Sequence, residues 1–426
     1  MSQPDDIAEL HRAFDDAIAA SMPAHAMASY LAAMTESPTA ILAIGKASGP
    51  MAQACRDAGL TGKGMLITHD PSVDVDGFDV FVGGHPVPHE GSVEAAQAAV
   101  NFVQALTADD HLLVLMSGGG SALMAMPAEG LSLDDKMMIH QTLLNSGMDI
   151  HQMNTIRRLV SGVKGGRLAR LAAPARITQW VMSDVPATGN KDHDLSAIAS
   201  GPFAGDPMAL DDGKRALTQA GLDHHDILQR FIKTLEDHPD LGPVRLGADV
   251  LDTVETTIIA SNEIARSAAE KALGEITITL PDLQGEAMIM GARIAEMIMD
   301  AGKPVTGVTG GETVVTIDAD GPCGKGGRSQ ELALSFLVAM SGYAEKGHDV
   351  PPFLLLAGGT DGRDGPTDAA GALVTDAMIT SGHRLAAWRE ALRRHDSYPV
   401  LESCSALLKM PPTGTNLGDL VIIKTG

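Results

Sequence analysis

A carboxylate, two cations and a cluster of glycines lie close together in Gly310–Phe336, GGETVVTIDADGPCGKGGRSQELALSF. The loop Gly324–Arg328 brings both cations to the expected start of a helix. Backbone N–H groups, the helix dipole and a guanidinium together bind anions. The stretch therefore predicts a phosphate or carboxylate site, and a glycine-rich hairpin with a helix cap is the alternative. Its candidate catalytic residues are Glu312 and Arg328, and its candidate binding residues are Gly326 and Gly327.

A lysine directly follows the first expected strand, in Ile44–Ala52, IGKASGPMA. A lysine at a strand end, just before a helix, can reach a transferred phosphoryl group. Lys46 is therefore a candidate catalytic residue, with Gly45 and Ser48 as binding residues beside it. A solvated surface charge is the alternative interpretation.

Three successive glycines between two serines follow another expected strand, in Met116–Met124, MSGGGSALM. The backbone N–H groups of such a run form a nest for an oxyanion or a phosphate. We therefore predict substrate or nucleotide binding here. The candidate binding residues are Ser117, Gly118, Gly119, Gly120 and Ser121.

Asp184 comes directly after an expected strand, where a carboxylate can hold a metal ion or accept a proton. The basic segment NTIRRLVSGVKGG adds Asn154 and Arg157 as binding candidates, and a solvated helix face is the alternative for that segment. His85, in GGHPVPHE, is a further candidate for lining the cleft.

Two loops in the second half of the chain carry polar side chains next to glycines. Asp361 lies in GGTDGRDGPTDAAG, and Asn416 lies in PPTGTNLGDL. The aspartates of the first loop could suggest calcium, but glycine and proline break the EF-hand spacing. We predict that Asp361 and Asn416 line the same cleft instead.

Strands and helices alternate in the first half of the chain, which predicts a Rossmann-like three-layer α/β domain with a mostly parallel sheet. Ligands of such sheets bind outside the carboxyl ends of the strands. The expected strands are Ala40–Ile44, Met65–Thr68, Asp79–Gly83, Leu112–Met116 and Ile177–Met182. The expected helices are Pro50–Asp57, Ser92–Leu106 with Ser92 as N-cap, and Leu133–Ser146 with Ser132 as N-cap.

A stretch of proline, glycine and charge near His238–Val250 predicts a boundary between a domain 1–245 and a smaller domain 246–426. A hairpin around Gly310-Gly311 indicates a mixed sheet in the second domain. Its expected strands are Thr256–Ala260, Ile276–Leu280, Val305–Thr309, Thr313–Ile317, Phe353–Ala357 and Leu420–Ile423. Its expected helices are Ile264–Ala272, Glu286–Ala301 and Glu331–Met340.

The composition narrows the class of protein. A length of 426 residues with 44% hydrophobic residues favours two globular domains. A formal net charge of −23 argues against nucleic acid and against anionic membranes as partners. The three cysteines match no disulfide framework or zinc pattern, and the N-terminus does not resemble a signal peptide, so a cytoplasmic location is expected.

Several common motifs are missing from the sequence. There is no Gly-x4-Gly-Lys-Ser/Thr, so the chain is not a P-loop NTPase, and the glycines of GKASG lack the spacing of a dinucleotide fingerprint. No His-Glu-x-x-His occurs. These absences leave a small-molecule enzyme with a different nucleotide site, or a protein that only binds a sugar acid or a nucleotide.

Taken together, the loops resemble the class II glycerate 2-kinase family, whose C-terminal half is called the MOFRL domain. The resemblance extends over nearly the whole chain, and its eight motifs occur in order. They are IGKASGPMA, GGHPVPHEGS, LMSGGGSALM, NTIRRLVSGVKGGRLA, SDVP…IASGP, GGETVVTI…GKGGRSQELAL, GGTDGRDGPTDAAG and PTGTNLGDL.

The resemblance implies ATP-dependent phosphorylation of D-glycerate at its 2-hydroxyl, in a cleft between two α/β domains, with Mg²⁺ bridging ATP oxygens. It implies Lys46 and Arg328 as catalytic cations, with Asp184 or Glu312 as metal ligand or base. Ser329 departs from the asparagine that is usual in the family. A homodimer, a related hydroxy acid as substrate, and an NAD(P)H-dependent hydroxypyruvate reductase stay open as alternatives.

Overall fold

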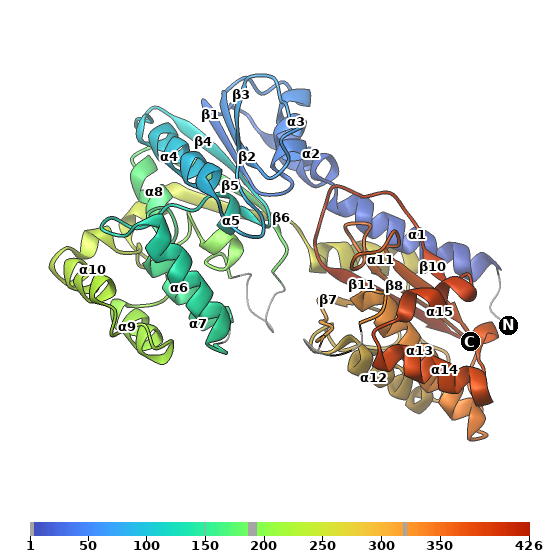
Figure 1. Ribbon diagram of the computed structural model, residues 1–426. Helices are drawn as coiled ribbons and strands as arrows, with labels where there is room; N and C mark the ends of the chain where they lie inside the picture. Colours follow the sequence, from blue (N-terminus) through green and yellow to red (C-terminus); the bar gives the residue numbers. More distant parts are fainter. Residues whose placement is uncertain (1–3, 149, 186–193, 318–320, 322) are drawn as a thin grey trace. The chain divides into compact units, whose positions relative to one another are not determined.

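The computed structural model describes residues 4–148, 150–185, 194–317, 321 and 323–426 (Figure 1). The chain forms two compact units. Met27–Ile259 form the N-terminal unit, and Met1–Ala26 with Ala260–Gly426 form the C-terminal unit.

The N-terminal unit contains a six-stranded sheet with the strand order β3-β2-β1-β4-β5-β6. The strands from β3 to β5 pair in parallel. This order is that of a Rossmann-like sheet, so the predicted fold class is confirmed and the strand order reverses between β1 and β4. The strands are β1 (Ala40–Ile44), β2 (Lys63–Thr68), β3 (Phe78–Val82), β4 (His111–Met116), β5 (Arg176–Ser183) and β6 (Val254–Ser261).

Continuous apolar runs form the central strands because both faces of the sheet are covered. All of β1 and β4 is buried. Alternate residues of β1 and β4 pack against α4 and α8, and α3 contacts the same strands as well as β2. The helices of the unit's sheet region are α2 (Pro23–Ala33), α3 (Ser48–Asp57), α4 (Glu90–Gln104), α5 (Gly120–Leu123) and α8 (Arg167–Ala172).

Four more helices of the N-terminal unit build a second apolar core beside the sheet. Ile139, Ile156, Leu217 and Phe231 each contribute a buried side chain from a different helix. The helices are α6 (Leu133–Asn145), α7 (Ile150–Leu159), α9 (Leu210–Gln219) and α10 (Asp226–Asp237).

The C-terminal unit contains a five-stranded sheet with the order β10-β9-β8-β11-β7. All of its neighbouring strands pair antiparallel. The segment before α12 adds two isolated parallel bridges, one between Leu283 and Gly311 and one between Glu286 and Val314. The sheet is therefore mixed only through these bridges. The strands are β7 (Thr306–Gly311), β8 (Phe353–Gly359), β9 (Gly371–Thr375), β10 (Leu407–Leu408) and β11 (Asp419–Thr425).

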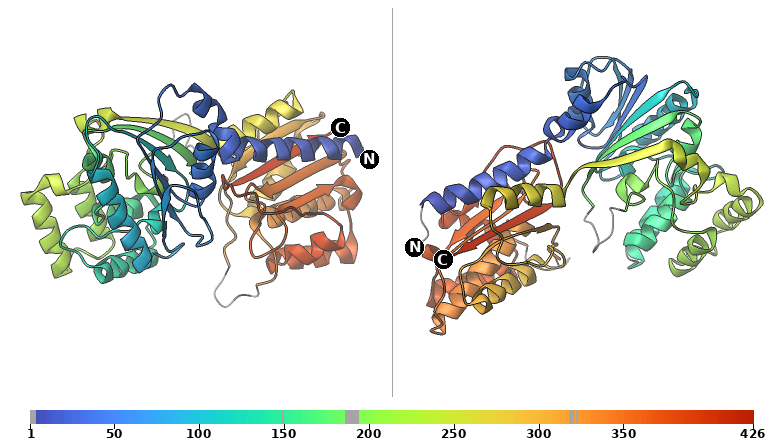
Figure 2. Two further views of the ribbon diagram at one scale, coloured as in Figure 1. Left: turned by 90° about the horizontal axis from the view of Figure 1, so that it is seen from above. Right: turned by 180° about the vertical axis from the view of Figure 1, so that it is seen from behind.

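Helices cover both faces of this sheet (Figure 2). Side chains alternate between the faces, as the two-residue period of a strand requires. Leu355 faces α12 and α13, whereas Leu354 and Leu356 face α1 and α11. The helices are α1 (Pro4–Ser21), α11 (Asn262–Leu273), α12 (Ala287–Ala301), α13 (Arg328–Glu345), α14 (Gly382–Arg393) and α15 (Ser397–Ser403).

The units differ from the predicted division at residue 245 in two respects. Helix α1 belongs to the C-terminal unit, because Leu10 and Phe14 pack with Ala265 and Ala269 of α11 and with the sheet. The N-terminal unit extends to Ile259, because β6 is the last strand of its sheet. A pattern of proline and glycine marks loops but does not show which sheet receives the next strand.

Four local predictions are wrong. Ile276–Leu280 and Thr313–Ile317 form no strand, and Gly310-Gly311 is not a hairpin turn, because β7 pairs with the distant β11. Ser92 is not the N-cap of its helix. His89 is the N-cap, and Ser92 completes the capping box three residues later.

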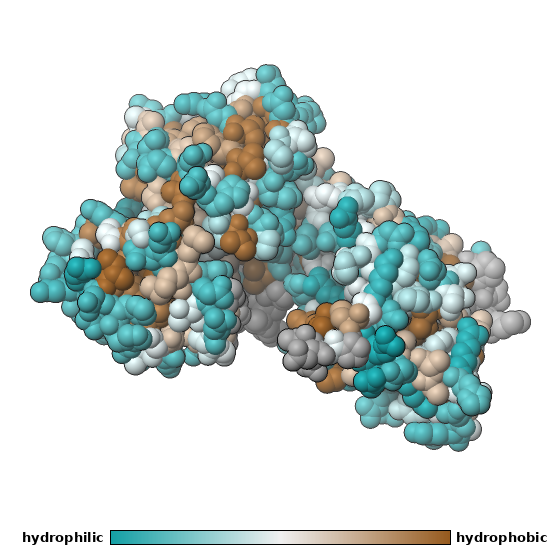
Figure 3. All heavy atoms as spheres, viewed as in Figure 1, coloured by the Kyte–Doolittle hydropathy of each residue, from teal (hydrophilic) through white to brown (hydrophobic). Residues whose placement is uncertain are grey.

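No helix among the described residues is long and apolar enough to span a membrane. The face drawn in Figure 3 is mostly hydrophilic with small apolar patches. Large exposed hydrophobic residues among those described include Val87, Met137 and Leu246.

Candidate functional site

Side chains from four parallel strands meet at the carboxyl end of the N-terminal sheet. Lys46 follows β1, His85 follows β3, the glycine nest follows β4 and Asp184 follows β5. This edge includes the point between β1 and β4 where the strand order reverses, which is the usual ligand position in such sheets. We call the group the strand-end cluster, made of Lys46, His85, Ser117–Ser121 and Asp184.

Backbone hydrogen bonds tie the turn after β1 to the turn after β4. Lys46 N donates to Gly118 O at 2.9 Å, and Gly45 N donates to Ile67 O at 3.1 Å. The buried Ser117 Oγ accepts from Ala47 N at 3.0 Å. Ser48 Oγ, also buried, donates to Ile67 O. Both hydroxyls therefore hold the position of Lys46, which is a different role from the ligand contact predicted for them.

The glycine nest lets three functional side chains approach the backbone closely. A Cβ on Gly118 would collide with the Asp184 carboxylate. Gly119 has a φ of +84°, and a Cβ there would lie 3.1 Å from Cδ2 of His85 and 3.1 Å from Cγ of Lys46. The glycines are thus required both by backbone conformation and by the space that these side chains occupy. The structure brings the predicted residues Lys46, His85, Asp184 and Gly118–Gly120 together.

The electrostatics of the strand-end cluster are cationic around Lys46. Burial, and then the charges of Lys46 and His69, lower the pKa of His85. A neutral imidazole is therefore favoured at neutral pH. Lys46 makes no ion pair within the described part of the chain. Such a partly buried, unpaired ammonium suits a negatively charged ligand.

The basic segment after α6 is not a solvated helix face. Arg158 is buried and pairs with Asp206 at 2.8 Å. Lys164 is buried as well, and its Nζ donates to Ser121 Oγ at 2.6 Å. Arg157 Nη1 donates to Asn154 Oδ1 at 3.3 Å, so Asn154 orients Arg157.

The C-terminal unit places a second charged group at one end of its sheet. Gly311 at the end of β7 and Gly359 at the end of β8 both pair with Asp419 at the start of β11. Arg328, the first residue of α13, pairs with Asp419 at 2.6 Å and with Glu312. We call Glu312, Arg328 and Asp419 the arginine cluster. The sequence prediction missed Asp419, although an aspartate at the start of an expected strand was a usable signal.

Charge pairing and burial compete in the arginine cluster. Burial raises the pKa of Asp419 to about 7, against the opposing effect of Arg328. Both carboxylates raise the pKa of Arg328, which outweighs its own burial. Arg328 is therefore charged at any physiological pH and is held in a fixed orientation.

The loop before α13 differs from the anion cradle that the sequence predicts. The Asp364 carboxylate accepts from Ser329 N at 3.1 Å and Gln330 N at 2.8 Å, so it caps the helix itself. A Cβ on Gly327 would collide with that carboxylate. The backbone N–H of Lys325 donates a hydrogen bond to Asp396 Oδ1 at 2.8 Å. The protein's own carboxylates thus use several of the amides that the sequence assigns to a ligand. Of the loop's two cations, Lys325 lies over the Tyr398 ring and Arg328 pairs with Glu312 and Asp419.

The other predicted residues of this unit have local roles. Asp361 Oδ1 accepts from Arg363 N, and Asn416 Oδ1 accepts from Gly418 N. Asp368 bonds to Tyr398 and Lys409, so the loop aspartates do not converge as calcium ligands would. Among the described residues, no group of three or more His, Cys, Asp or Glu side chains could hold a metal ion.

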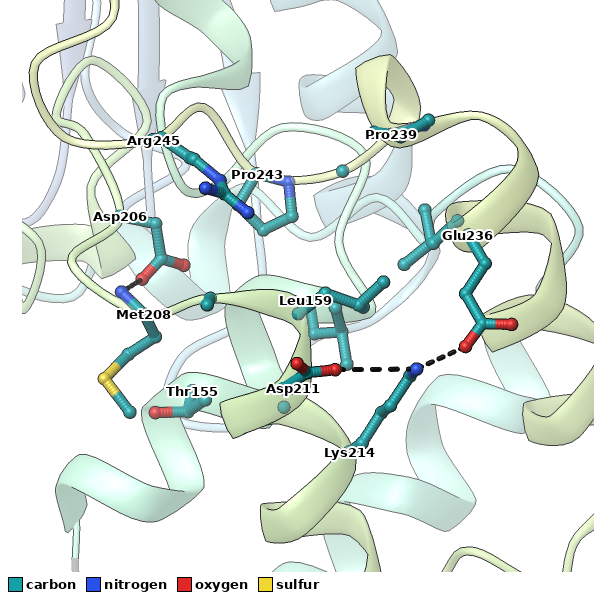
Figure 4. A pocket seen from close by; sticks show the side chains of 15 residues that line it. Thr155, Leu159, Asp206, Met208, Asp211, Lys214, Glu236, Pro239, Pro243 and Arg245 are labelled. Carbon is teal, nitrogen blue, oxygen red and sulfur yellow. Dashed lines mark hydrogen bonds and ion pairs between the residues drawn. The ribbon is translucent and has the colours of Figure 1, made fainter.

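A cavity of about 320 Å³, which none of the predicted site residues lines, lies between α7, α9, α10 and the segment 239–245 (Figure 4). Its Lys214 pairs with Glu236 and with Asp211, and its Asp206 pairs with Arg158. These three charged side chains are already compensated, whereas Arg245, which also lines the cavity, has no ion pair within the described residues.

Comparison with known proteins agrees with this architecture. Residues 9–235 match a domain of unknown function, DUF4147, and residues 305–419 match the MOFRL family. The chain is 35% identical to a putative hydroxypyruvate reductase of Agrobacterium vitis, over 98% of this chain and 94% of that protein. It is 34% identical to a D-glycerate 2-kinase of Thermotoga maritima, over 95% of both chains.

A crystal structure of a glycerate kinase from Thermotoga maritima superposes on the chain with a TM-score of 0.84. The superposition covers 99% of this chain and all of the other, at 32% sequence identity. The two-unit architecture is therefore that of a solved glycerate kinase.

Proposed function

Because the chain belongs to the glycerate kinase family that joins a DUF4147 domain to a MOFRL domain, we propose that it transfers the γ-phosphoryl group of ATP to the 2-hydroxyl of D-glycerate. The observation that carries the proposal is Lys46. It lies beside the Gly118–Gly120 nest at the strand-order reversal, and it makes no ion pair within the described residues. A preorganised ammonium of this kind stabilises the charge that develops during phosphoryl transfer.

The remaining members of the strand-end cluster have complementary roles in this proposal. The N–H groups of Gly118–Gly120 bind phosphate or carboxylate oxygens. Asp184, held against Gly118, accepts the proton of the attacking hydroxyl or holds a metal ion. Its single carboxylate fits Mg²⁺ that arrives with ATP, since such ions keep most of their ligands from phosphates and water. When bound, Mg²⁺ neutralises phosphate charge.

Arg328 supplies the second cation. Its guanidinium is fixed by Asp419 and Glu312, so little side-chain entropy is lost when it meets a phosphate. The proposal requires Arg328 and Lys46 to act on the same pair of substrates.

A hydroxypyruvate reductase is the second candidate function, because a similar protein from Agrobacterium vitis is named a putative hydroxypyruvate reductase. A dinucleotide pyrophosphate normally binds at the glycine-rich turn after the first strand. Here that turn contains Lys46, and the amide of Ala47 at the helix start is bonded to Ser117 Oγ. The local structure thus favours the kinase.

One assay separates the two functions. The protein is incubated with ATP, Mg²⁺ and a panel of short hydroxy acids, and phosphorus NMR locates the phosphate on the product. We expect ADP and 2-phosphoglycerate. Oxidation of NADH by hydroxypyruvate, with no ADP formed from any acid, would overturn the proposal.

A further inference from the structure

A second cavity of the N-terminal unit borders the strand-end cluster and has a volume of about 300 Å³. Ser121, the last residue of the glycine nest, lines it, and so do the prolines that follow His85. Four basic side chains also line it: Lys136, His140, Arg157 and Lys164. We call this cavity the basic pocket.

The basic side chains of the pocket are held by neutral partners. Lys164 Nζ donates to the carbonyl of Ser121 at 2.8 Å and to its hydroxyl, and Lys136 Nζ donates to Met126 O at 2.8 Å. Arg157 contacts the amide oxygen of Asn154, while its buried Nε has no hydrogen-bond partner. Donor capacity thus remains available in the pocket.

None of the four is in an ion pair within the described ranges. Burial is the largest cause that lowers the pKa of Lys136 to about 7, and it also lowers the pKa of Lys164 and of His140. The neighbouring positive charges lower these pKa values further, so the charged forms repel one another, and a bound anion would favour them. In a chain of net charge −23, carboxylates are abundant, yet none in the described part of the chain forms an ion pair with this group.

Nearby basic residues show that the fold can provide counter-charges. Arg158 follows Arg157 in α7 and pairs with the buried Asp206. Lys214, in the cavity of Figure 4, pairs with Asp211 and Glu236. The basic pocket differs from these places because its counter-ion is missing from the described protein, so an anion from solution would relieve the repulsion.

The rest of the pocket limits the kind of anion. Met137, Ile139 and Val160 line it alongside the basic groups, and its volume is at the small end of the range of about 300–1,000 Å³ for ligand pockets. A short organic acid fits this combination, since its carboxylate can face the cations and its carbon chain the apolar wall.

We propose that the basic pocket binds the carboxylate of the acceptor acid, with Arg157 and Lys136 as its specificity-determining contacts. The inference rests on the proposed kinase function, because it identifies where the acceptor is held. Ser121 lines the pocket and is also the last residue of the nest beside Lys46, so the proposal requires the hydroxyl of the bound acid to lie on the Ser121 side of the pocket.

The test measures binding of D-glycerate by calorimetry without ATP, in the full chain and in Arg157→Gln and Lys136→Gln. We expect each variant to raise the Kd for D-glycerate at least tenfold, roughly the loss of one charge-assisted hydrogen bond. The KM for D-glycerate should rise with it, while the KM for ATP stays the same. Arg176→Gln, which removes an exposed arginine paired with Glu36, is the matched control and should bind as the wild type does.

The possible results distinguish failure of the pocket assignment from failure of the kinase proposal. Phosphorylation of D-glycerate with unchanged Kd in both variants overturns the pocket and leaves the kinase intact. Binding of short carboxylates that depends on Arg157, without phosphorylation of any acid, supports the pocket and overturns the kinase. Binding of inorganic phosphate in this pocket in preference to carboxylates would overturn the carboxylate assignment. Thermal melting of each variant, compared with Arg176→Gln, shows that the fold is retained.

Discussion

The cations of the two candidate sites differ in whether carboxylates pair with them. In the C-terminal unit, Arg328 lies between Glu312 and Asp419, so the arginine cluster is already more than neutralised. In the N-terminal unit, Lys46 and the cations of the basic pocket have no counter-charge among the described residues. The first arrangement fixes the direction of a guanidinium, and the second keeps binding free energy for an anionic ligand. Under the proposed function, the N-terminal unit would provide most of the binding for anions and the C-terminal unit would add one oriented charge.

Replacement of Lys46 by methionine tests the unpaired cation most directly. Methionine keeps much of the volume but removes the charge, so we expect kcat for phosphoryl transfer to fall by about 10³-fold, the size of other losses of electrostatic stabilisation. Steady-state kinetics with D-glycerate measures the effect, and circular dichroism checks the fold. Wild-type turnover in this variant would remove Lys46 from the mechanism.

Arg328→Gln tests the paired cation and should have a smaller effect on turnover, about 10²-fold, because the neighbouring carboxylates partly offset the charge that is lost. The same change leaves the buried Asp419 without its partner, so the C-terminal unit should also lose stability. Kinetics and thermal melting are measured together. A larger loss of kcat in Arg328→Gln than in Lys46→Met would show that Arg328 contributes more to turnover than Lys46 does.

Asp364 is expected to affect the stability of the protein rather than its turnover, and the effect appears in the pH dependence of that stability. Burial raises its pKa from 3.8 to about 6. Between these two values the folded state keeps a proton that the unfolded state has released, so the group's stabilising contribution is complete below pH 4 and is lost as pH rises to about 6. The size of the loss is about 3 kcal/mol.

The matched variant for this prediction is Asp364→Asn, whose side chain does not titrate. From pH 4 to pH 6, the melting temperature of the wild type should fall relative to that of the variant. Above pH 6, the difference between the two should stay constant. A difference that stays constant over this range would show that Asp364 titrates normally.

The sequence predicts the N-terminal sheet well, because each of its central strands is buried on both faces and therefore reads as an unbroken apolar run. The residues of the strand-end cluster could be predicted for the same reason. In a parallel sheet the carboxyl ends of all strands meet at one edge, so position in sequence is enough to bring Lys46 and Asp184 together.

The C-terminal sheet is harder to predict because its pairings join distant segments. Strand β7 pairs with β11 about a hundred residues later, and no local pattern records that. The glycines of the loop before Arg328 suggest an open anion nest, yet their close neighbour is Asp364 from another loop. The basic pocket could be predicted only in part, since Arg157 and Lys164 lie in the basic segment that the sequence singles out, whereas Lys136 and His140 come from α6.

The assignment of α1 to the C-terminal unit has a consequence for synthesis of the chain. The apolar face of α1, with Leu10 and Phe14, is made first, but α11 and the sheet that cover it are made after residue 260. The N-terminal unit, Met27–Ile259, is continuous in sequence and can fold while the ribosome is still translating. The C-terminal unit must wait for β11 at the end of the chain. Throughout that interval α1 exposes a hydrophobic surface that a chaperone could bind.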